Sequence, residues 1–328
     1  MQRDLRAEGL LVLTALIWGG TFAAIKWALI DISPMLLVGI RFLLAAFLAW
    51  PLLLRREVSA DQVESMTDSQ KPHSLFSRTT WLWGSLIGLG MLAGYAGQTI
   101  GLKYTTVARS GFITYSFALY VPFLQFLIIG KRPGVGNLLG LFVVILGLSF
   151  ITDPQVGAIR AGDFSPLRVW RVAAELSRGG WNKGDLFTFG GAVGYAFYVV
   201  LLDRATRICH PGEVTLVQMF VCGILALALS PLVESPVLVV SWRLAGALFY
   251  LVVLGSIVAL ALMNWFQRRL SPLRAVLIYS LEPVFAAFIG WTMFGTGMSV
   301  RESIGAFFIL SGILVSDLWD FIRRSHRT

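Results

Sequence analysis

One carboxylate, Glu282, lies within an apolar segment in the second half of the chain and is followed at once by Pro283. Proline removes a backbone donor, so a helix through this segment is expected to kink and to leave the carbonyl oxygen of Tyr279 without its helical partner. A carboxyl in so apolar a setting must be paired or protonated. Glu282 could therefore exchange a coupling proton or bind a substrate ammonium group. A neutral Glu282 that hydrogen-bonds the broken helix is the structural alternative.

Polar and aromatic side chains occur at a similar depth in several other apolar segments. Rings with a polar tip suit an amphipathic ligand, because one part of the side chain is apolar and the other forms hydrogen bonds. Packing between helices is the competing use of such rings. We predict a substrate-binding set that consists of Trp18, Tyr95, Gln98, Tyr115, Tyr198, Asn264, Tyr279 and Glu282. Its few fixed charges favour aromatic or broadly amphipathic cargo.

Four further positions are candidates for gating or coupling together with Glu282. Pro122 interrupts an apolar segment of the first half as Pro283 does in the second, and paired interruptions in two repeats indicate a central binding site in transporters. Lys26 and Arg41 are cations within apolar segments, where a charge is costly. Both lie toward a segment end, so the alternative is that their long side chains reach the membrane interface.

These residues must be positioned by helices that lie in a membrane. Hydrophobic residues make up 56% of the chain and charged residues 14%, against about 25% charged in a soluble domain. One span needs about 20 apolar residues. We predict an all-α membrane protein with ten transmembrane helices, at about 10–30, 34–54, 81–102, 107–130, 134–152, 186–203, 214–233, 244–267, 274–295 and 303–320.

An internal repeat relates the two halves of the chain. Four residues of the first half recur 165 positions later: Gly130, Gly140, Phe142 and Gly147 correspond to Gly295, Gly305, Phe307 and Gly312. A repeat of five spans, an odd number, places the second copy upside down relative to the first, which is the architecture of many secondary transporters. The expected domains are a first repeat at 1–152, an external loop at 153–184 and a second repeat at 185–328.

The distribution of Lys and Arg predicts the orientation in the membrane. One side carries sixteen of them and the other nine, five of which lie in the single long loop 153–184. Positive loops are cytoplasmic, so we expect both termini in the cytoplasm and the protein in the cell inner membrane. Residues 55–80 then form a cytoplasmic linker, and an amphipathic segment within 153–184 lies on the outer membrane surface. Because the basic residues are scattered over short loops, their net charge does not indicate binding to nucleic acid.

The sequence contains no recognisable apparatus for enzyme chemistry or metal binding. Cys209 and Cys222 lack metal-site spacing and are expected to be reduced thiols, with Cys222 packed as a small hydrophobe. The three histidines, His73, His210 and His326, all fall in loops or tails. We see no zinc-protease, nucleophile-elbow or phosphate-loop motif. We therefore predict no cofactor, no metal and no enzymatic activity.

Short patterns along almost the whole chain resemble the EamA-type branch of the drug/metabolite transporter superfamily. Trp18, Gly19, Phe22 and Lys26 match the WGxxFxxxK pattern of that family, and further matches are Pro34, Arg41, the segment from Gly101 to Thr106, Gly184 to Leu186, Ser271 to Ala275, and Ser280 to Phe285. The family usually has Gly-Glu after the fourth and ninth spans. Here Lys131 and Thr296 stand at those two positions, so both carboxylates are missing.

The resemblance implies a ten-helix carrier of small metabolites, most often amino acids and related amphipathic compounds. Together with the residues above, it predicts an alternating-access carrier that exports a small metabolite, with the lipid bilayer and a small-molecule substrate as its partners and a proton as the candidate coupling ion. Uptake of a metabolite or vitamin is the alternative within transport. A membrane-embedded enzyme or a sensor is the alternative of another class.

Overall fold

The computed structural model describes residues 4–53, 76–105, 107–152, 182–294 and 300–325. Within these ranges the fold is helical and has no strand. The first half contains α1 (Leu5–Ala28), α2 (Pro34–Leu53), α4 (Arg78–Tyr104), α5 (Val107–Tyr115), α6 (Phe117–Leu124), the π-helix η1 (Gln125–Ile129) and α7 (Val135–Thr152). The predicted linker at 55–80 is described only for residues 76–80, and the predicted external loop at 153–184 only for residues 182–184. Thr296 lies outside the described residues.

The second half, like the first, begins with two long helices and ends with one. It contains α9 (Lys183–Ala205), α10 (Pro211–Val233), α11 (Trp242–Phe249), the π-helix η3 (Tyr250–Val258), α12 (Ala259–Phe266), the short 3-10 helix η4 (Gln267–Arg269), α13 (Pro272–Tyr279), α14 (Glu282–Phe294) and α15 (Val300–Ser325). Each segment that the sequence indicated as apolar carries one of these helices or a run of them.

Several helices are long and apolar enough to cross a membrane. Within the described residues five meet this description: Leu5–Ala28, Pro34–Leu53, Lys183–Ala205, Pro211–Val233 and the continuous run Trp242–Arg269. Shorter apolar helices cover Ile113–Ile129, Val135–Gly147 and Ser303–Ser316. Large apolar side chains such as Phe47, 79% exposed, and Leu232, 80% exposed, point outward. An apolar surface of this kind is compatible with lipid and not with water, and the protein is a multi-pass membrane protein.

The helix that carries Glu282 is broken where the sequence predicts it. α13 ends at Tyr279 and α14 begins at Glu282. The hydroxyl of Ser280 donates to the carbonyl oxygen of Leu277 at 2.5 Å, so a side chain replaces a helical donor at the break. Because Pro283 has no N–H, the carbonyl of Tyr279 is free for another donor. The predicted kink is confirmed.

In the fourth apolar segment the break lies elsewhere than predicted. Pro122 sits inside α6, whereas the interruption falls at Ser116, between α5 and α6. The Ser116 hydroxyl donates to the carbonyl oxygen of Ile113 at 2.6 Å, which repeats the arrangement at Ser280. A serine side chain that bonds back to the preceding turn competes with the helical ladder. The expectation that Pro122 marks the interruption is therefore wrong by six residues.

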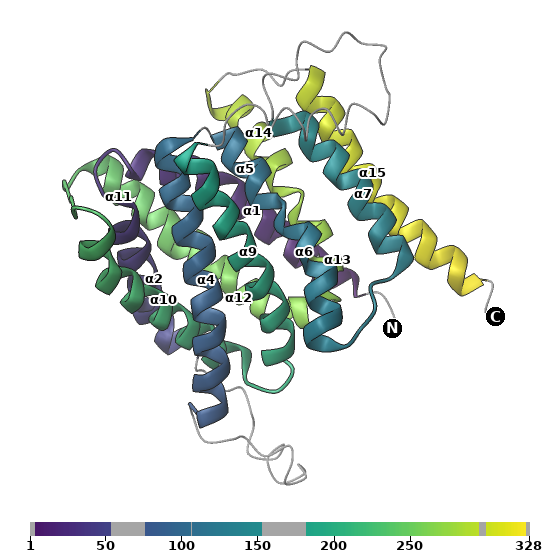
Figure 1. The fold of residues 1–328 in the computed structure, drawn as a ribbon, viewed down its shortest axis with the longest axis horizontal. Coiled ribbons are helices and arrows are strands. Elements are labelled where there is room, and N and C mark those ends of the chain that lie inside the picture. Colours follow the sequence, from purple (N-terminus) through teal and green to yellow (C-terminus); the bar gives the residue numbers. More distant parts are fainter. Residues whose placement is uncertain (1–3, 54–75, 106, 153–181, 295–299, 326–328) are drawn as a thin grey trace.

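Glycines allow two pairs of helices to pack with their backbones in contact. α4 lies against α9, where a Cβ on Gly97 would come within 2.7 Å of the backbone of Gly191. α7 and α15 run side by side along one edge of the molecule (Figure 1). There, a Cβ on Gly140 would lie 2.5 Å from the carbonyl oxygen of Gly312, and a Cβ on Gly147 would lie 2.6 Å from that of Gly305. A larger side chain at any of these glycines would therefore meet the backbone of the neighbouring helix.

Ion pairs join the two halves of the chain at both ends of the helices. At one end, Asp31 pairs with Arg243 at 2.7 Å and accepts the hydroxyl of Ser241 at 2.6 Å. The hydrogen bond from Arg243 has the larger effect and that from Ser241 the smaller, and together they hold the pKa of Asp31 below its ordinary value. At the other end, Glu8 pairs with Arg274 at 3.2 Å. Each pair ties α1 or the turn after it to a helix of the second half.

Candidate functional site

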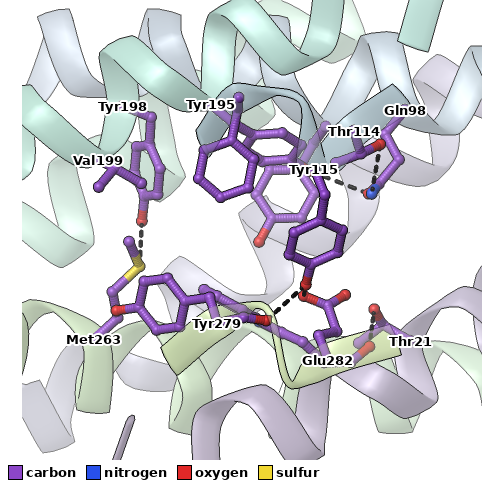
Figure 2. Close-up of a pocket in the computed structure, with 13 residues that line it drawn as sticks. Thr21, Gln98, Thr114, Tyr115, Tyr195, Tyr198, Val199, Met263, Tyr279 and Glu282 are labelled. Atoms are coloured by element: carbon purple, nitrogen blue, oxygen red, sulfur yellow. Dashed lines mark hydrogen bonds between the residues drawn. The ribbon is translucent and has the colours of Figure 1, made fainter. Parts of the chain in front are cut away.

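A pocket lies in the interior of the helix assembly, between α4, α5 and α9 on one side and α1, α12, α13 and α14 on the other (Figure 2). The empty space within it, its opening included, is about 520 Å³. Most of the lining side chains are aromatic. The lining consists of Trp18, Thr21, Tyr95, Gln98, Thr114, Tyr115, Phe117, Tyr195, Tyr198, Val199, Met263, Tyr279 and Glu282.

Glu282 lies in this pocket at the first position of α14, directly after the helix break. Oε2 of its carboxylate accepts a hydrogen bond from the hydroxyl of Tyr115. The same hydroxyl lies 2.9 Å from the carbonyl oxygen of Tyr279, the acceptor that Pro283 leaves without a helical donor. Figure 2 shows the Tyr115 hydroxyl directed at both acceptors. Tyr115, the last residue of α5, thus joins the break in one half of the chain to the break in the other.

Most polar tips of the pocket's rings are bound to protein acceptors. Tyr195 donates to the amide oxygen of Gln98 at 3.1 Å, and Tyr279 donates to that of Gln267 at 3.1 Å. The indole N–H of Trp18 donates to the carbonyl oxygen of Gly255 at 3.2 Å. These bonds fix the orientation of the rings. What the rings present to the pocket is therefore mainly their apolar bodies.

Seven of the eight side chains predicted from the sequence as a substrate-binding set line this pocket. The exception is Asn264. It is fully buried and donates through Nδ2 to the hydroxyl oxygen of Thr215 at 2.5 Å, so it links α12 to α10 away from the pocket. Asn264 lies one helical position after Met263, which does line the pocket, and this single step places the two side chains on different faces of α12.

Arg41 is a buried cation behind the pocket wall. It is 2% exposed, so its side chain does not reach the membrane interface. Its Nε donates to the Ser256 hydroxyl at 2.7 Å and its Nη2 to the Gly255 carbonyl at 3.1 Å. These partners lie in the π-helix η3. The guanidinium also lies 5.0 Å from the ring centre of Tyr95, and that ring is part of the pocket lining.

Lys26 does not approach the pocket. Its side chain is exposed, and its ammonium group donates to the carbonyl oxygen of Leu102 at 2.8 Å. A cation that binds the last carbonyls of a helix stabilises that helix end. Lys26 is therefore placed as a cap on the end of α4.

Six residues of the pocket lining are absent from the predicted set: Thr21, Thr114, Phe117, Tyr195, Val199 and Met263. Tyr195 is three residues before Tyr198 on α9, and residues three apart share a helix face. This spacing could have identified it. Phe117 lies just after the break that follows Tyr115. A helical pattern drawn through an unbroken segment would have placed Phe117 on the wrong face.

The pocket offers one carboxylate and no metal-binding cluster among the described residues. No group of three or more His, Cys, Asp or Glu side chains that could hold a metal ion occurs in the described part of the chain. Both cysteines are free, and Cys222 is buried in the core. The arrangement can therefore bind a small molecule and exchange a proton.

Comparison with known families decides what kind of protein this is. The model of the EamA-like transporter family matches residues 5–153 and 182–316. The chain belongs to this family of transporters. This EamA-like protein carries its pocket residues within the matched ranges, and its family and relatives are named as transporters rather than as enzymes.

Relatives of this EamA-like protein cover most of its length. An uncharacterized transporter of Archaeoglobus fulgidus is 25% identical over 94% of this chain and 84% of its own. The S-adenosylmethionine/S-adenosylhomocysteine transporter of Chlamydia muridarum is 27% identical over 87% of this chain and 83% of its own. A solved crystal structure with 19% identity has a TM-score of 0.71 and covers 97% of this chain and 98% of that one, which supports the fold alone.

Proposed function

We propose that this EamA-like protein is a secondary transporter of the cell inner membrane that exports a small amphipathic metabolite, such as an amino acid or a related compound. The observation that carries the proposal is the interior pocket at which two broken helices meet through Tyr115 and Glu282. In transporters, substrate and coupling ions bind near the membrane midplane at discontinuous helices. Uptake of a metabolite through the same pocket is the alternative direction.

The proposal includes ten spans arranged as two inverted repeats, at residues 1–152 and 185–328, separated by an external loop. The break at Ser116 lies 164 positions before Ser280 and 165 before Leu281, the two residues of the second break, and 165 is the offset of the paired glycines. The two ranges that the family model matches, 5–153 and 182–316, nearly coincide with these repeats. Each repeat then has one divided helix that carries a pocket residue at its break.

Packing between helices also supports an exchange symmetry of the two repeats. Interchanging the repeats replaces the contact of α4 with α9 by the contact of η3 and α12 with α1. It likewise replaces the contact of α1 with α14 by the contact of α9 with α6. All of these contacts are present. The glycine pairs 140–312 and 147–305 also interchange. A contact pattern that maps onto itself in this way is what a two-fold axis generates. Here the axis would relate two halves of one chain.

Alternating access would require the two ends of the assembly to open in turn. With both termini in the cytoplasm, the pair of Asp31 with Arg243 closes the external end and the pair of Glu8 with Arg274 closes the internal end. Each pair joins the two repeats, so breaking one while keeping the other would expose the pocket to one side. A coupling proton would bind at Glu282, because it is the carboxylate of the pocket lining.

The proposal is tested by counterflow in liposomes that contain the purified protein. Labelled amino acids, amines, nucleosides and vitamins are added outside liposomes loaded with the same unlabelled compound. We expect transient accumulation of at least one class, and its loss in Glu282→Ala but not in Glu213→Ala, a buried carboxylate outside the pocket lining. Equal accumulation in empty liposomes, or for all variants, would contradict the proposal.

The class of small metabolites is also supported by the relatives. One relative is named as a transporter of S-adenosylmethionine and S-adenosylhomocysteine, and that name concerns that protein alone. For the present chain it supports a small organic molecule as cargo rather than an inorganic ion. The membrane-embedded enzyme and the sensor are not favoured, since the family and its relatives are named as transporters.

A further inference from the structure

The charge of the pocket is the first feature that restricts its ligand. Among the described residues that line it, Glu282 is the only one with a formal charge. Within the described part of the chain, only Oε2 of the Glu282 carboxylate accepts a hydrogen bond. The other carboxylate oxygen, Oε1, is left for a ligand. A buried carboxylate is costly unless it is paired with an opposite charge or protonated. A ligand with an ammonium group would supply that pairing.

The hydrogen-bond donors of the pocket are a second restriction. A ligand carboxylate needs donors, ideally a bidentate Arg or free N–H groups. The donors of Trp18, Tyr195 and Tyr279 are already bound to protein acceptors at 3.1–3.2 Å. The Tyr115 hydroxyl is bound to Glu282 and Tyr279. Among the described lining residues, the hydroxyls of Tyr95 and Thr114 and the amide group of Gln98 remain as neutral donors, and no cation is present. A carboxylate in this pocket would thus meet no opposite charge and would face Glu282 as a like charge.

The rings themselves provide a favourable surface for a cation. Trp18 and Tyr279 lie 5.4 Å apart between ring centres on one side of the pocket, and Tyr95 and Tyr195 lie 5.2 Å apart on the other. Faces of Trp and Tyr rings attract ammonium groups, and aromatic cages are the usual way in which proteins bind alkylated ammonium ions. The combination of such rings with a single carboxylate matches an organic cation.

Arg41 is the nearest candidate for binding a ligand carboxylate, but its position does not favour this role. Its guanidinium is 2% exposed and donates to Ser256 and Gly255. The ring of Tyr95, 5.0 Å from the guanidinium carbon, belongs to the wall that faces the pocket. A carboxylate would reach Arg41 only after this ring moved and these hydrogen bonds were exchanged.

We infer that the pocket selects small organic ammonium ions that lack a carboxylate over zwitterions such as amino acids. The inference rests on the proposed function, since it names the substrate class of the same pocket. It follows from the lone carboxylate of Glu282, the ring faces around it and the absence of a cation from the described lining residues. Within the small amphipathic metabolites of the proposed function, it favours amines and quaternary ammonium compounds over the amino acids given there as an example.

Matched ligands test this inference on the purified full-length protein. Phenethylamine, phenylalanine and 2-phenylethanol share one phenylethyl body and differ in charge, and their affinities are measured by equilibrium dialysis. We expect phenethylamine to bind at least tenfold more tightly than the other two. Glu282→Gln should abolish the preference for the amine over the alcohol, whereas Glu213→Gln, which removes the same charge outside the pocket lining, should preserve it.

Counterflow separates the failure of this inference from that of the proposed function. Phenyltrimethylammonium is used as the cation, because its fixed charge prevents leakage across the liposome membrane. Exchange of this cation with little exchange of phenylalanine is the expected result. If phenylalanine binds as tightly as phenethylamine, or is exchanged while the cation is not, the inference is overturned and transport stands. If neither is bound or exchanged, the inference is also overturned, and the remaining compound classes of the counterflow screen decide on transport.

Discussion

Tyr115 and Glu282 are 167 positions apart and hydrogen-bond to each other across the pocket. The Tyr115 hydroxyl has a second acceptor, the carbonyl oxygen of Tyr279, at 2.9 Å. A hydroxyl carries one proton and can donate it fully to only one acceptor at a time. When Glu282 is protonated or paired with a ligand cation, the Tyr115 proton becomes available to Tyr279. The charge at Glu282 is therefore linked to the hydrogen bonding of the helix break.

Removal of the Tyr115 hydroxyl should impair transport without unfolding the protein. In Tyr115→Phe, Glu282 and the Tyr279 carbonyl both lose their donor. A hydrogen bond to a charged group contributes about 1.5–3 kcal/mol, so we expect the counterflow rate to fall about ten- to a hundredfold. Tyr120→Phe is the control, since Tyr120 lies on the adjacent helix α6 and outside the pocket lining. Equal rates for the two variants would show that the Tyr115 contact has no part in transport.

Glu282→Gln should separate coupling from exchange. Glutamine retains the shape of the side chain and can form hydrogen bonds, but it cannot take up and release a proton. We expect flux driven by a pH gradient to fall sharply, while exchange of substrate between the two sides continues at substrate concentrations high enough to offset the weaker binding of a cation. Both are measured in the same liposomes, with and without the gradient. An unchanged response to the gradient would leave Glu282 as a structural residue of the helix break.

The position of the functional helix break could be predicted because a specific residue causes it. Pro283 lacks an N–H, and the consequence for Tyr279 follows from helix geometry. The break at Ser116 could not be located in this way. The hydroxyl of Ser116 bonds back to Ile113 at this break, but the hydroxyl of Thr188 bonds back to Gly184 within α9, which stays unbroken. Pro122, the more conspicuous signal, lies inside α6.

The π-helix η3 had no signal in the sequence at all. Tyr250–Val258 is an apolar run that an ordinary helix would accommodate equally well. The wider turns are stabilised by tertiary partners, since Arg41 and Trp18 both donate to the carbonyl oxygen of Gly255. Neither partner is near this run in the sequence. The wrong assignment of Asn264 to the pocket lining has the same cause. The face that α12 turns to the pocket depends on the π-helix that directly precedes it.

The glycine contact between α7 and α15 predicts which substitutions disturb folding. A side chain at Gly147 would lie 2.6 Å from the carbonyl oxygen of Gly305, and one at Gly312 would lie 2.6 Å from that of Gly140. Overpacking of this kind costs about 1–3 kcal/mol. We expect Gly147→Leu and Gly312→Leu each to lower the yield of folded protein in detergent. Leu138→Phe should be milder, because Leu138 is 40% exposed. Normal yields for both glycine variants would mean that these helices do not need their close approach.

The ion pair at the predicted external end should respond to acid in a defined direction. Hydrogen bonds from Arg243 and Ser241 lower the pKa of Asp31 from its ordinary value of 3.8. A group whose pKa is lower in the folded state stabilises the fold above its ordinary pKa and loses that effect as the pH falls through the folded value. We expect the melting temperature of wild type to exceed that of Asp31→Asn from pH 7 to below pH 4 and to converge with it in stronger acid. A difference that is absent at pH 7 would contradict a stabilising pair.

The central claim is that the pocket binds the cargo and opens alternately to the two sides of the membrane. It is tested in variants without Cys209 and Cys222 that carry one new cysteine each. Val240→Cys, at a residue 88% exposed, marks the external side of the predicted topology. Lys131→Cys, also at an exposed residue, marks the cytoplasmic side. Thr114→Cys lies in the pocket wall.

The measurement is the reaction of each cysteine with an impermeant thiol reagent, in intact cells and in inverted membrane vesicles. We predict that Val240→Cys reacts only in cells and Lys131→Cys only in vesicles. Thr114→Cys should react in both, and a transported compound should slow that reaction from either side. Reaction of Thr114→Cys from one side alone, or at a rate that the transported compound does not change, would contradict the account.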